Sequence, residues 1–210
     1  MAKIDNGAGG AFKGTLGTMV GSSWKGIPYI KSKPKKRKGK VGDAEMNNRK
    51  KFGMSQAWLS PLVDFVRVGF KGYSRTVEGF VAAKSYLHKH AMEGEGKDLR
   101  INPALVRLSH GDLPLPTDIE VSLKDGNLEF TWNNPAIIDG SSHDQTMVVA
   151  YDIDRGYPYY LQNGEWRMTG RQQLKITSTL TNRTYHIYFA MVAADHSRRS
   201  NSVYLGTVIS

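Results

Sequence analysis

The chain has 210 residues, of which 40% are hydrophobic, so it can bury one substantial core or two small ones. It contains no cysteine, which excludes disulfides, thiolate nucleophiles and cysteine-ligated zinc or iron–sulfur sites. The formal net charge is +10, and +9 of this lies in residues 1–42, which hold ten Lys or Arg and one acid. The partner of this first segment should therefore be negatively charged: nucleic acid, a membrane surface or an acidic protein face.

The opening sequence MAKIDNGAGG lacks the apolar core of a secretory signal peptide, and no apolar run approaches the length that spans a bilayer. We expect cytoplasmic synthesis without a signal peptide, and no membrane span. A virion or another assembled particle stays open as the final location.

Residues 1–42 form the first predicted region, a basic glycine-rich arm. Its seven glycines between positions 7 and 26 recur too often for a helix. The stretch TMVGSSWKGIPYI alternates near a period of two, which predicts two short strands, at 15–21 and 24–31, in a ribbon. A lone hairpin is marginally stable in water, so the ribbon needs a surface to lie on. The predicted anchor side chains for that surface are Phe12, Trp24, Ile27 and Tyr29.

The run KSKPKKRKGK at 31–40 carries seven positive charges in ten residues. Contact with phosphates would make binding strongly dependent on salt, because each contact releases counterions. An acidic protein surface and a solvated linker are the two alternatives. Trp24 and Tyr29 precede the run and can stack on bases or pack on protein. The candidate polyanion-binding residues are Lys25, Lys31, Lys33, Lys35, Lys36, Arg37, Lys38 and Lys40.

The glycines of the arm do not complete a phosphate-binding motif. A P-loop needs a lysine directly after its last glycine, whereas Gly14 is followed by Thr15. A dinucleotide fingerprint needs a third glycine where this chain has Phe12. We expect no cofactor, and unusual backbone dihedrals in a hairpin-forming arm explain the glycines.

Residues 43–96 are predicted to form a block of three helices, with Asp43 as an N-cap of the first and Pro61 at the start of the second. The block has more aromatic residues than short helices can bury among themselves, so some should pack on the following domain, the arm or another subunit. The third helix has an apolar stripe formed by Val77, Phe80, Val81, Leu87 and Ala91 and interrupted by the stem of Lys84. The expected helix bounds are 43–60, 60–72 and 76–92.

Residues 97–116 are predicted to be a connector that includes a strand at 104–111. From 117 to 210, about eight short strands are separated by regularly spaced turn signals, which is typical of an antiparallel β-sandwich. Asp125–Gly126 and Asn163–Gly164 are predicted to close two hairpins. The expected fold class is α+β, with an extended β-ribbon arm, a short helical block and a C-terminal sandwich.

The predicted sandwich resembles a fibronectin type III domain in the segments LEFTWNNP, MVVAYDID and LTNRTYHIYFAMVAADHSRRSNSVYLGTV. Trp132 matches the tryptophan of that family's second strand. Tyr185, five residues after Leu180, resembles the tyrosine that follows the family's leucine–proline–glycine turn, although Asn182–Arg183 replaces the proline–glycine. The resemblance implies a fibronectin III- or immunoglobulin-like topology.

A second resemblance spans nearly the whole chain. Glycines and apolar residues of the arm, then LSPLVDFVRVGFK, then a C-terminal SNSVYLGTV are similar to an uncharacterised family of Bacteroidota proteins. This resemblance brings no activity with it, but it implies that the arm is a defined part of the protein. The matching arm positions are Gly10, Phe12, Gly14, Gly17, Val20, Gly21, Trp24, Lys25, Gly26, Ile27, Ile30 and Pro34.

No set of residues predicts a catalytic or metal site. His88 and His90 are two apart on a predicted helix and so point to different faces, which is poor geometry for shared ligands. His186 is predicted to point away from the core face of its strand. Asp152 and Asp154 are interpreted as turn-forming residues, because no third ligand accompanies them. The nucleophile motif G-x-S-x-G does not occur, and we expect no enzyme activity.

These patterns lead to three hypotheses. The first is a non-catalytic structural or assembly protein, a subunit of a virion-like particle, filament or array, whose basic arm docks on neighbouring subunits or on a polyanion. It implies a homo-oligomer or a larger assembly. The second is a nucleic-acid-associated accessory protein, bound to a ribosome or genome, with 31–40 as its phosphate-binding segment. The third is a carbohydrate- or surface-binding sandwich, which rests on fold analogy alone.

Overall fold

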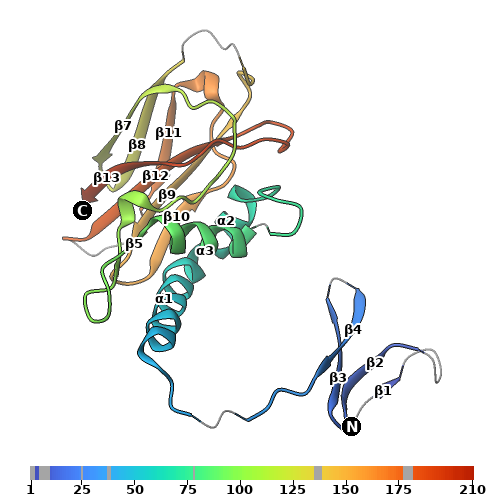
Figure 1. The fold of residues 1–210 in the computed structure, drawn as a ribbon. Coiled ribbons are helices and arrows are strands. Elements are labelled where there is room, and N and C mark those ends of the chain that lie inside the picture. Colours follow the sequence, from blue (N-terminus) through green and yellow to red (C-terminus); the bar gives the residue numbers. More distant parts are fainter. Residues whose placement is uncertain are drawn as a thin grey trace. The chain divides into compact units, whose positions relative to one another are not determined.

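A computed structural model describes the chain except for residues 1–2, 5–9, 25, 37–38, 78, 135–138 and 177–181. The structure combines helices with antiparallel sheets, so the predicted mixed α+β class is confirmed (Figure 1). The chain divides into two compact units, Met1–Gly42 and Asp43–Ser210.

The first unit is a single antiparallel sheet with the strand order β1-β2-β3-β4. The predicted strand at 15–21 is wrong, because the chain turns at Gly17 and Thr18, in its middle. Gly17 has φ +58°, a left-handed value that glycine adopts without steric cost. The unit therefore has more strands than expected, and they are β1 (Lys3–Ile4), β2 (Phe12–Leu16), β3 (Met19–Trp24) and β4 (Ile27–Ser32).

The second unit begins with the three predicted helices. The third helix starts at Gly79 instead of 76, after a turn in which the Ser74 hydroxyl accepts from the backbone N–H of Val77. The predicted apolar stripe on this helix is only partly correct, since Val81 is 59% exposed while both alanines of the helix are buried. The observed elements are α1 (Asp43–Leu59), the 3-10 turn η1 (Ser60–Leu62), α2 (Val63–Gly69) and α3 (Gly79–His90).

Two larger antiparallel sheets follow the helices. One has four strands in the order β10-β9-β12-β13, and the other has three in the order β11-β8-β7. A short pair of strands, β5 (Met92–Glu93) and β6 (Arg100–Ile101), precedes them in the chain. The strand bounds are β7 Thr117–Lys124, β8 Asn127–Asn133, β9 Gln145–Asp152, β10 Tyr157–Leu161, β11 Arg171–Lys175, β12 Thr184–Val192 and β13 Val203–Ile209.

The two predicted hairpins have different outcomes. Asp125–Gly126 joins β7 to β8 and is confirmed. Asn163–Gly164 does not join two strands, because the N–H of Gly164 donates to Thr146 and the N–H of Thr146 donates to Glu165. The chain thus returns to β9 and continues into the 3-10 turn η3 (Arg167–Thr169).

The predicted strand at 104–111 is wrong as well. The segment starts in the 3-10 turn η2 (Pro103–Leu105). Its next backbone groups bond to separated parts of the chain: the N–H of Leu108 donates to the Ser202 hydroxyl, and the N–H of His110 donates to the carbonyl of Gly69. No single neighbouring strand is available, so no ladder forms.

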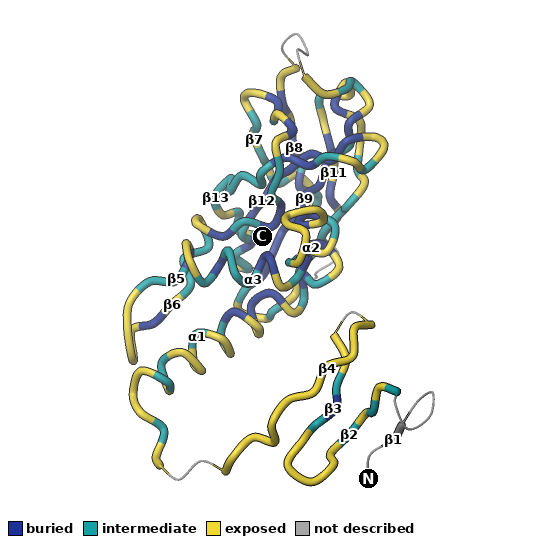
Figure 2. The backbone as a smooth tube through the Cα atoms, turned by 45° about the vertical axis from the view of Figure 1, so that its right-hand side comes forward, coloured by how far each residue is buried: buried dark blue, intermediate teal, exposed yellow. Residues whose placement is uncertain are grey.

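The two central strands of the four-stranded sheet, β9 and β12, are buried on both faces, and Figure 2 shows them in dark blue. Because side chains alternate along a strand, odd positions of β12 from Tyr185 to Met191 join one core together with Phe130 and Trp132 of the three-stranded sheet. Tyr188, Ala190 and Val192 join the second core, formed with the helices. Trp58, Phe65 and Phe70 of the helical block are buried in this second core, and Phe80 and Tyr86 pack against it. Phe52 and Tyr73 stay 54% and 37% exposed.

Trp58 and Tyr151 tie the helices to the sheet. The two rings meet edge to face with centroids 5.0 Å apart, a favourable aromatic geometry. The Tyr151 hydroxyl donates to the Trp58 carbonyl at 2.9 Å, so its polar end is satisfied in the core. Burial raises the pKa of Tyr151 to about 12, and this keeps the phenol a hydrogen-bond donor at all ordinary pH values.

Candidate interaction surfaces on the N-terminal sheet

The register of β3 and β4 decides which side chains of the first unit share a face. Trp24 lies opposite Ile27, and Ser22 lies opposite Tyr29. Residues that are directly opposed, or two apart on one strand, point to the same side of a sheet. Three of the four predicted anchors therefore lie together on one side, which we call the aromatic face and which comprises Val20, Ser22, Trp24, Ile27, Tyr29 and Lys31.

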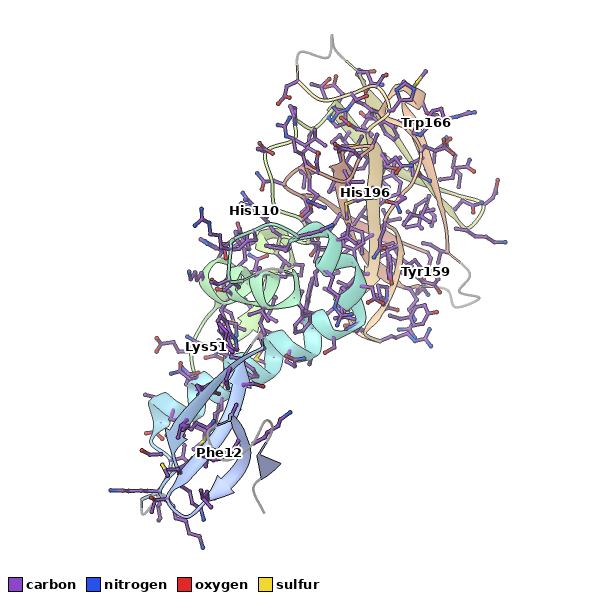
Figure 3. All side chains as sticks on the ribbon, turned by 90° about the vertical axis from the view of Figure 1, so that its right-hand side faces the viewer. Phe12, Lys51, His110, Tyr159, Trp166 and His196 are labelled. Carbon is purple, nitrogen blue, oxygen red and sulfur yellow. The ribbon has the colours of Figure 1, made fainter. Side chains whose placement is uncertain are left out.

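The opposite side of the sheet, which we call the aliphatic face, comprises Leu16, Met19, Gly21, Ser23, Pro28, Ile30 and Ser32. Leu16 is paired with Met19, and Gly21 is paired with Ile30. The fourth predicted anchor, Phe12 (labelled in Figure 3), belongs here, because a Cβ on Gly21 would collide with its carbonyl and ring. Gly21 is thus required by close packing of β2 on β3, and Phe12 is half-buried inside the unit.

Both faces present large apolar side chains to solvent. Trp24, Ile27 and Tyr29 are 41–63% exposed, and Leu16, Met19 and Ile30 are 45–61% exposed. The described residues of the first unit form one sheet and supply no second layer on either side of it, and all six residues of β4 are exposed (Figure 2). Exposed apolar side chains gathered in this way are typical of an interaction surface.

The basic residues continue directly from β4. The Lys31 ammonium lies 5.8 Å from the centre of the Tyr29 ring, within range of a cation–π contact. The N–H of Lys33 donates to the Thr18 carbonyl at 2.8 Å, which extends the pairing one residue past the end of β4. Lys35, Lys36 and Lys40 are exposed. Lys25, Arg37 and Lys38 lie outside the described residues.

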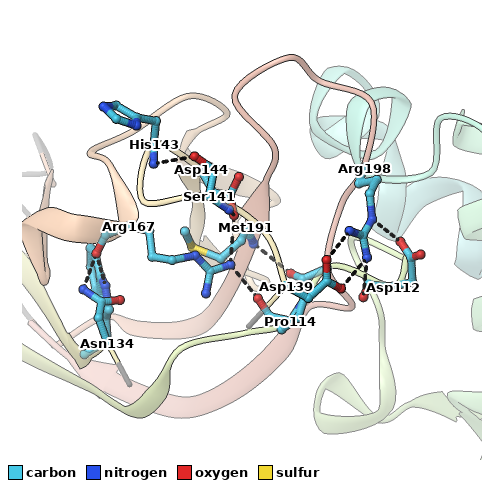
Figure 4. A network of polar contacts seen from close by, with 12 residues as sticks. Asp112, Pro114, Asn134, Asp139, Ser141, His143, Asp144, Arg167, Met191 and Arg198 are labelled. Carbon is cyan, nitrogen blue, oxygen red and sulfur yellow. Dashed lines mark hydrogen bonds and ion pairs between the residues drawn. The ribbon is translucent and has the colours of Figure 1, made fainter. Parts of the chain in front are cut away.

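Several acids of the second unit form ion pairs within that unit. Arg198 holds Asp112 and Asp139 at 3.1 and 2.7 Å, and its hydrogen bond is the main reason why the pKa of Asp139 is lowered (Figure 4). Asp144 and Arg167 form a buried pair at 3.3 Å. The unit as a whole carries eighteen acids against nineteen bases. Its acids therefore do not make a complement for the +9 charge of the first unit.

Polar clusters elsewhere have structural explanations. The Ser55 hydroxyl lies 2.7 Å from Nε2 of His88, yet Ser55 is fully buried and also donates to the Phe52 carbonyl, so it ties α1 to α3 and is not reachable as a nucleophile. His186 points away from the face of Tyr185, as predicted, and lies 2.9 Å from the Tyr204 hydroxyl. In the described part of the chain no three His, Cys, Asp or Glu are placed to hold a metal ion.

Sequence reasoning missed Leu16, Met19 and Ile30 as surface residues. Their alternation was visible, but the faces depend on the strand register, which the turn at Gly17 shifts. Sequence reasoning also missed the ion pairs that Arg198 forms with two aspartates in Figure 4, for another reason. Asp112, Asp139 and Arg198 come from three separate loops that only the fold brings together.

The chain belongs to a family of unknown function (DUF6266), whose sequence pattern matches residues 11–206. The match includes β2, β3, β4 and the basic run, so the arm is part of the family pattern. No curated protein and no solved structure matches this chain. No helix in the described residues is long and apolar enough to cross a membrane.

Proposed function

We propose that this is a non-catalytic assembly protein in which the N-terminal sheet docks on a neighbouring copy of the chain. The observation that carries the proposal is the exposed aliphatic face. Leu16, Met19 and Ile30 place three large side chains on one side of a sheet for which the described residues of this unit supply no second layer. Because this face has no charged member, it suits an apolar protein surface and gives a polyanion nothing to bind.

The outer edge of β4 supports the same proposal. The N–H of Lys33 bonds to β3, so by strand alternation the backbone groups of Tyr29 and Lys31 also face β3, whereas those of Pro28, Ile30 and Ser32 face outward. Proline, which has no N–H, is tolerated at such an outward position. Ile30 and Ser32 leave donors and acceptors with which another strand can pair, as in β-augmentation.

The second unit would serve as the scaffold, and we propose that it is a fibronectin III-like sandwich. Two sheets of four and three strands that share a core support this topology. Trp132, which is buried on β8 against Phe189 with ring centroids 5.5 Å apart, occupies the position that the resemblance implies. A Bacteroidota origin and a place in a virion-like particle, filament or array belong to the same proposal.

The test is the native mass of the purified chain by light scattering coupled to gel filtration. The full chain should exceed the 23.4 kDa of a monomer, and the triple variant L16S/M19S/I30S should return to that mass. The matched control is V81S/L105S/M168S, which removes three equally exposed apolar side chains of the second unit and should leave the assembly intact. A monomeric full chain at all concentrations, or equal loss in both triple variants, would refute the proposal.

A further inference from the structure

The aromatic face differs from the aliphatic face in its chemistry. Trp24 and Tyr29 are diagonal neighbours across β3 and β4, since Tyr29 lies two residues beyond Ile27, the partner of Trp24. Lys31 follows two residues further along the same strand and the same side. With a rise of about 3.3 Å per residue, these side chains form a track about 13 Å long from Ile27 to Lys31.

This track continues into the basic run without a break. β4 ends at Ser32, and the chain leads on to Lys33, Lys35 and Lys36, which are exposed and form no ion pair within the described residues. No acid occurs anywhere between Asp5 and Asp43 in the sequence. A ligand that follows this track therefore meets flat rings first and then positive charges, with no carboxylate to repel it.

We propose that the aromatic face and the basic run together bind single-stranded nucleic acid. Unpaired bases expose the flat faces that stack on Trp and Tyr rings, and the phosphates that follow them pair with lysines. A duplex hides its base faces and offers only phosphates, so it would use the basic run alone. This proposal is independent of the docking of the aliphatic face, because the two surfaces lie on opposite sides of one sheet.

The charge balance favours a polyanion over a second copy of the chain as the ligand of this face. Another copy presents a second unit of nearly balanced charge, in which some acids are already paired with arginines such as Arg198 and Arg167. Nucleic acid supplies regularly spaced negative charges together with stacking surfaces. An anionic lipid surface supplies the charges without the bases.

The experiment measures fluorescence anisotropy of a labelled oligo(dT) strand titrated with the full chain. Binding should weaken steeply as salt rises, and W24L should weaken it at least about fivefold, since a lost stacking contact costs roughly that much or more. W24F, which keeps an aromatic ring, should bind more tightly than W24L. K33S/K35S/K36S should reduce the salt dependence. L16S/M19S/I30S, on the other face, should bind like the unchanged chain.

Three results would overturn this proposal. The first is equal binding by W24L and the unchanged chain, which would leave only non-specific charge attraction. The second is equal affinity for a duplex of the same length. The third is binding to vesicles of anionic phospholipid without binding to oligo(dT), which would assign the face to a lipid surface. Circular dichroism of W24L and W24F must show equal strand content, so that loss of the sheet is not mistaken for loss of stacking.

Discussion

The buried ion pair between Arg167 and Asp144 allows a sharp test of what holds the second unit together. Their side chains are 5% and 1% exposed, and Nη2 of Arg167 lies 3.3 Å from Oδ2 of Asp144 (Figure 4). The same guanidinium donates to the Pro114 carbonyl at 2.6 Å, and Oδ2 of Asp144 accepts from the N–H of Ser141 at 2.9 Å. The substitution Arg167→Met removes the cation but keeps most of its apolar volume.

The expected cost follows from what remains. In R167M the Asp144 carboxylate stays buried with one neutral donor, and breaking a buried pair on one side costs about 3–5 kcal/mol. For a domain of this size, each kcal/mol lowers the melting temperature by about 2–4 °C, so the variant should melt about 6–20 °C lower. In R167M/D144N the buried charge disappears while the amide oxygen can still accept from Ser141, so most of the loss should be recovered.

Urea unfolding, followed by tryptophan fluorescence and by circular dichroism, measures both variants and D144N alone. The difference between the double variant and the two single variants gives the coupling energy of the pair. The reasoning is refuted if R167M loses less than about 1 kcal/mol, or if R167M/D144N is no more stable than R167M, because an uncompensated buried charge would then not be the cause.

Two further predictions concern the second unit. The pKa values of His88, His110 and His186 are lowered, chiefly by burial. Below the ordinary histidine pKa of about 6.5, the unfolded chain therefore binds protons that the folded chain does not bind. Stability should therefore fall as the pH drops from 7 to 5, and the urea midpoint should fall less in H88Q; an unchanged or rising midpoint would contradict this. Tyr151→Phe removes the hydroxyl that donates to the Trp58 carbonyl, and the free energy of unfolding measured by calorimetry should fall by about 1–2 kcal/mol. An unchanged free energy of unfolding would show that this hydrogen bond does not stabilise the fold.

The sequence predicted those features whose causes are local. The sequence predicted the Asp125–Gly126 turn because Asp and Gly tolerate the left-handed φ values that a tight hairpin requires. Both residues adopt such values in the structure. The first helix, Asp43–Leu59, ends one residue before the predicted 60, and Pro61 lies in the 3-10 turn that follows it. Asn163–Gly164 has the same local signal, yet its backbone partner is Thr146, which lies earlier in the chain. Turn chemistry alone could not decide between these outcomes.

The burial of β12 on both faces shows a second limit. From Ile187 to Val192 every residue of β12 is apolar or aromatic, so along this stretch no polar side marks which face meets the helices. The excess of aromatics in the helical block indicated a missing partner surface, but three partners were compatible with it. The contacts of Trp58 with Tyr151 and of Phe65 with Tyr160 identify the sheet as that surface.

The two faces of the N-terminal sheet also connect the hypotheses that the sequence left open. The alternation along β4 sends Ile27, Tyr29 and Lys31 to one side of the sheet and Pro28 and Ile30 to the other. Because the sides are opposite, one sheet can dock on a neighbouring copy and hold a nucleic acid strand at the same time. Assembly would then place several basic runs along one strand, and the resulting avidity would exceed the affinity of a single arm without any new contact. Light scattering with and without oligo(dT) tests whether docking and nucleic acid binding occur together. If they do, the assembly should persist when oligo(dT) is added, whereas competition between them would make it dissociate.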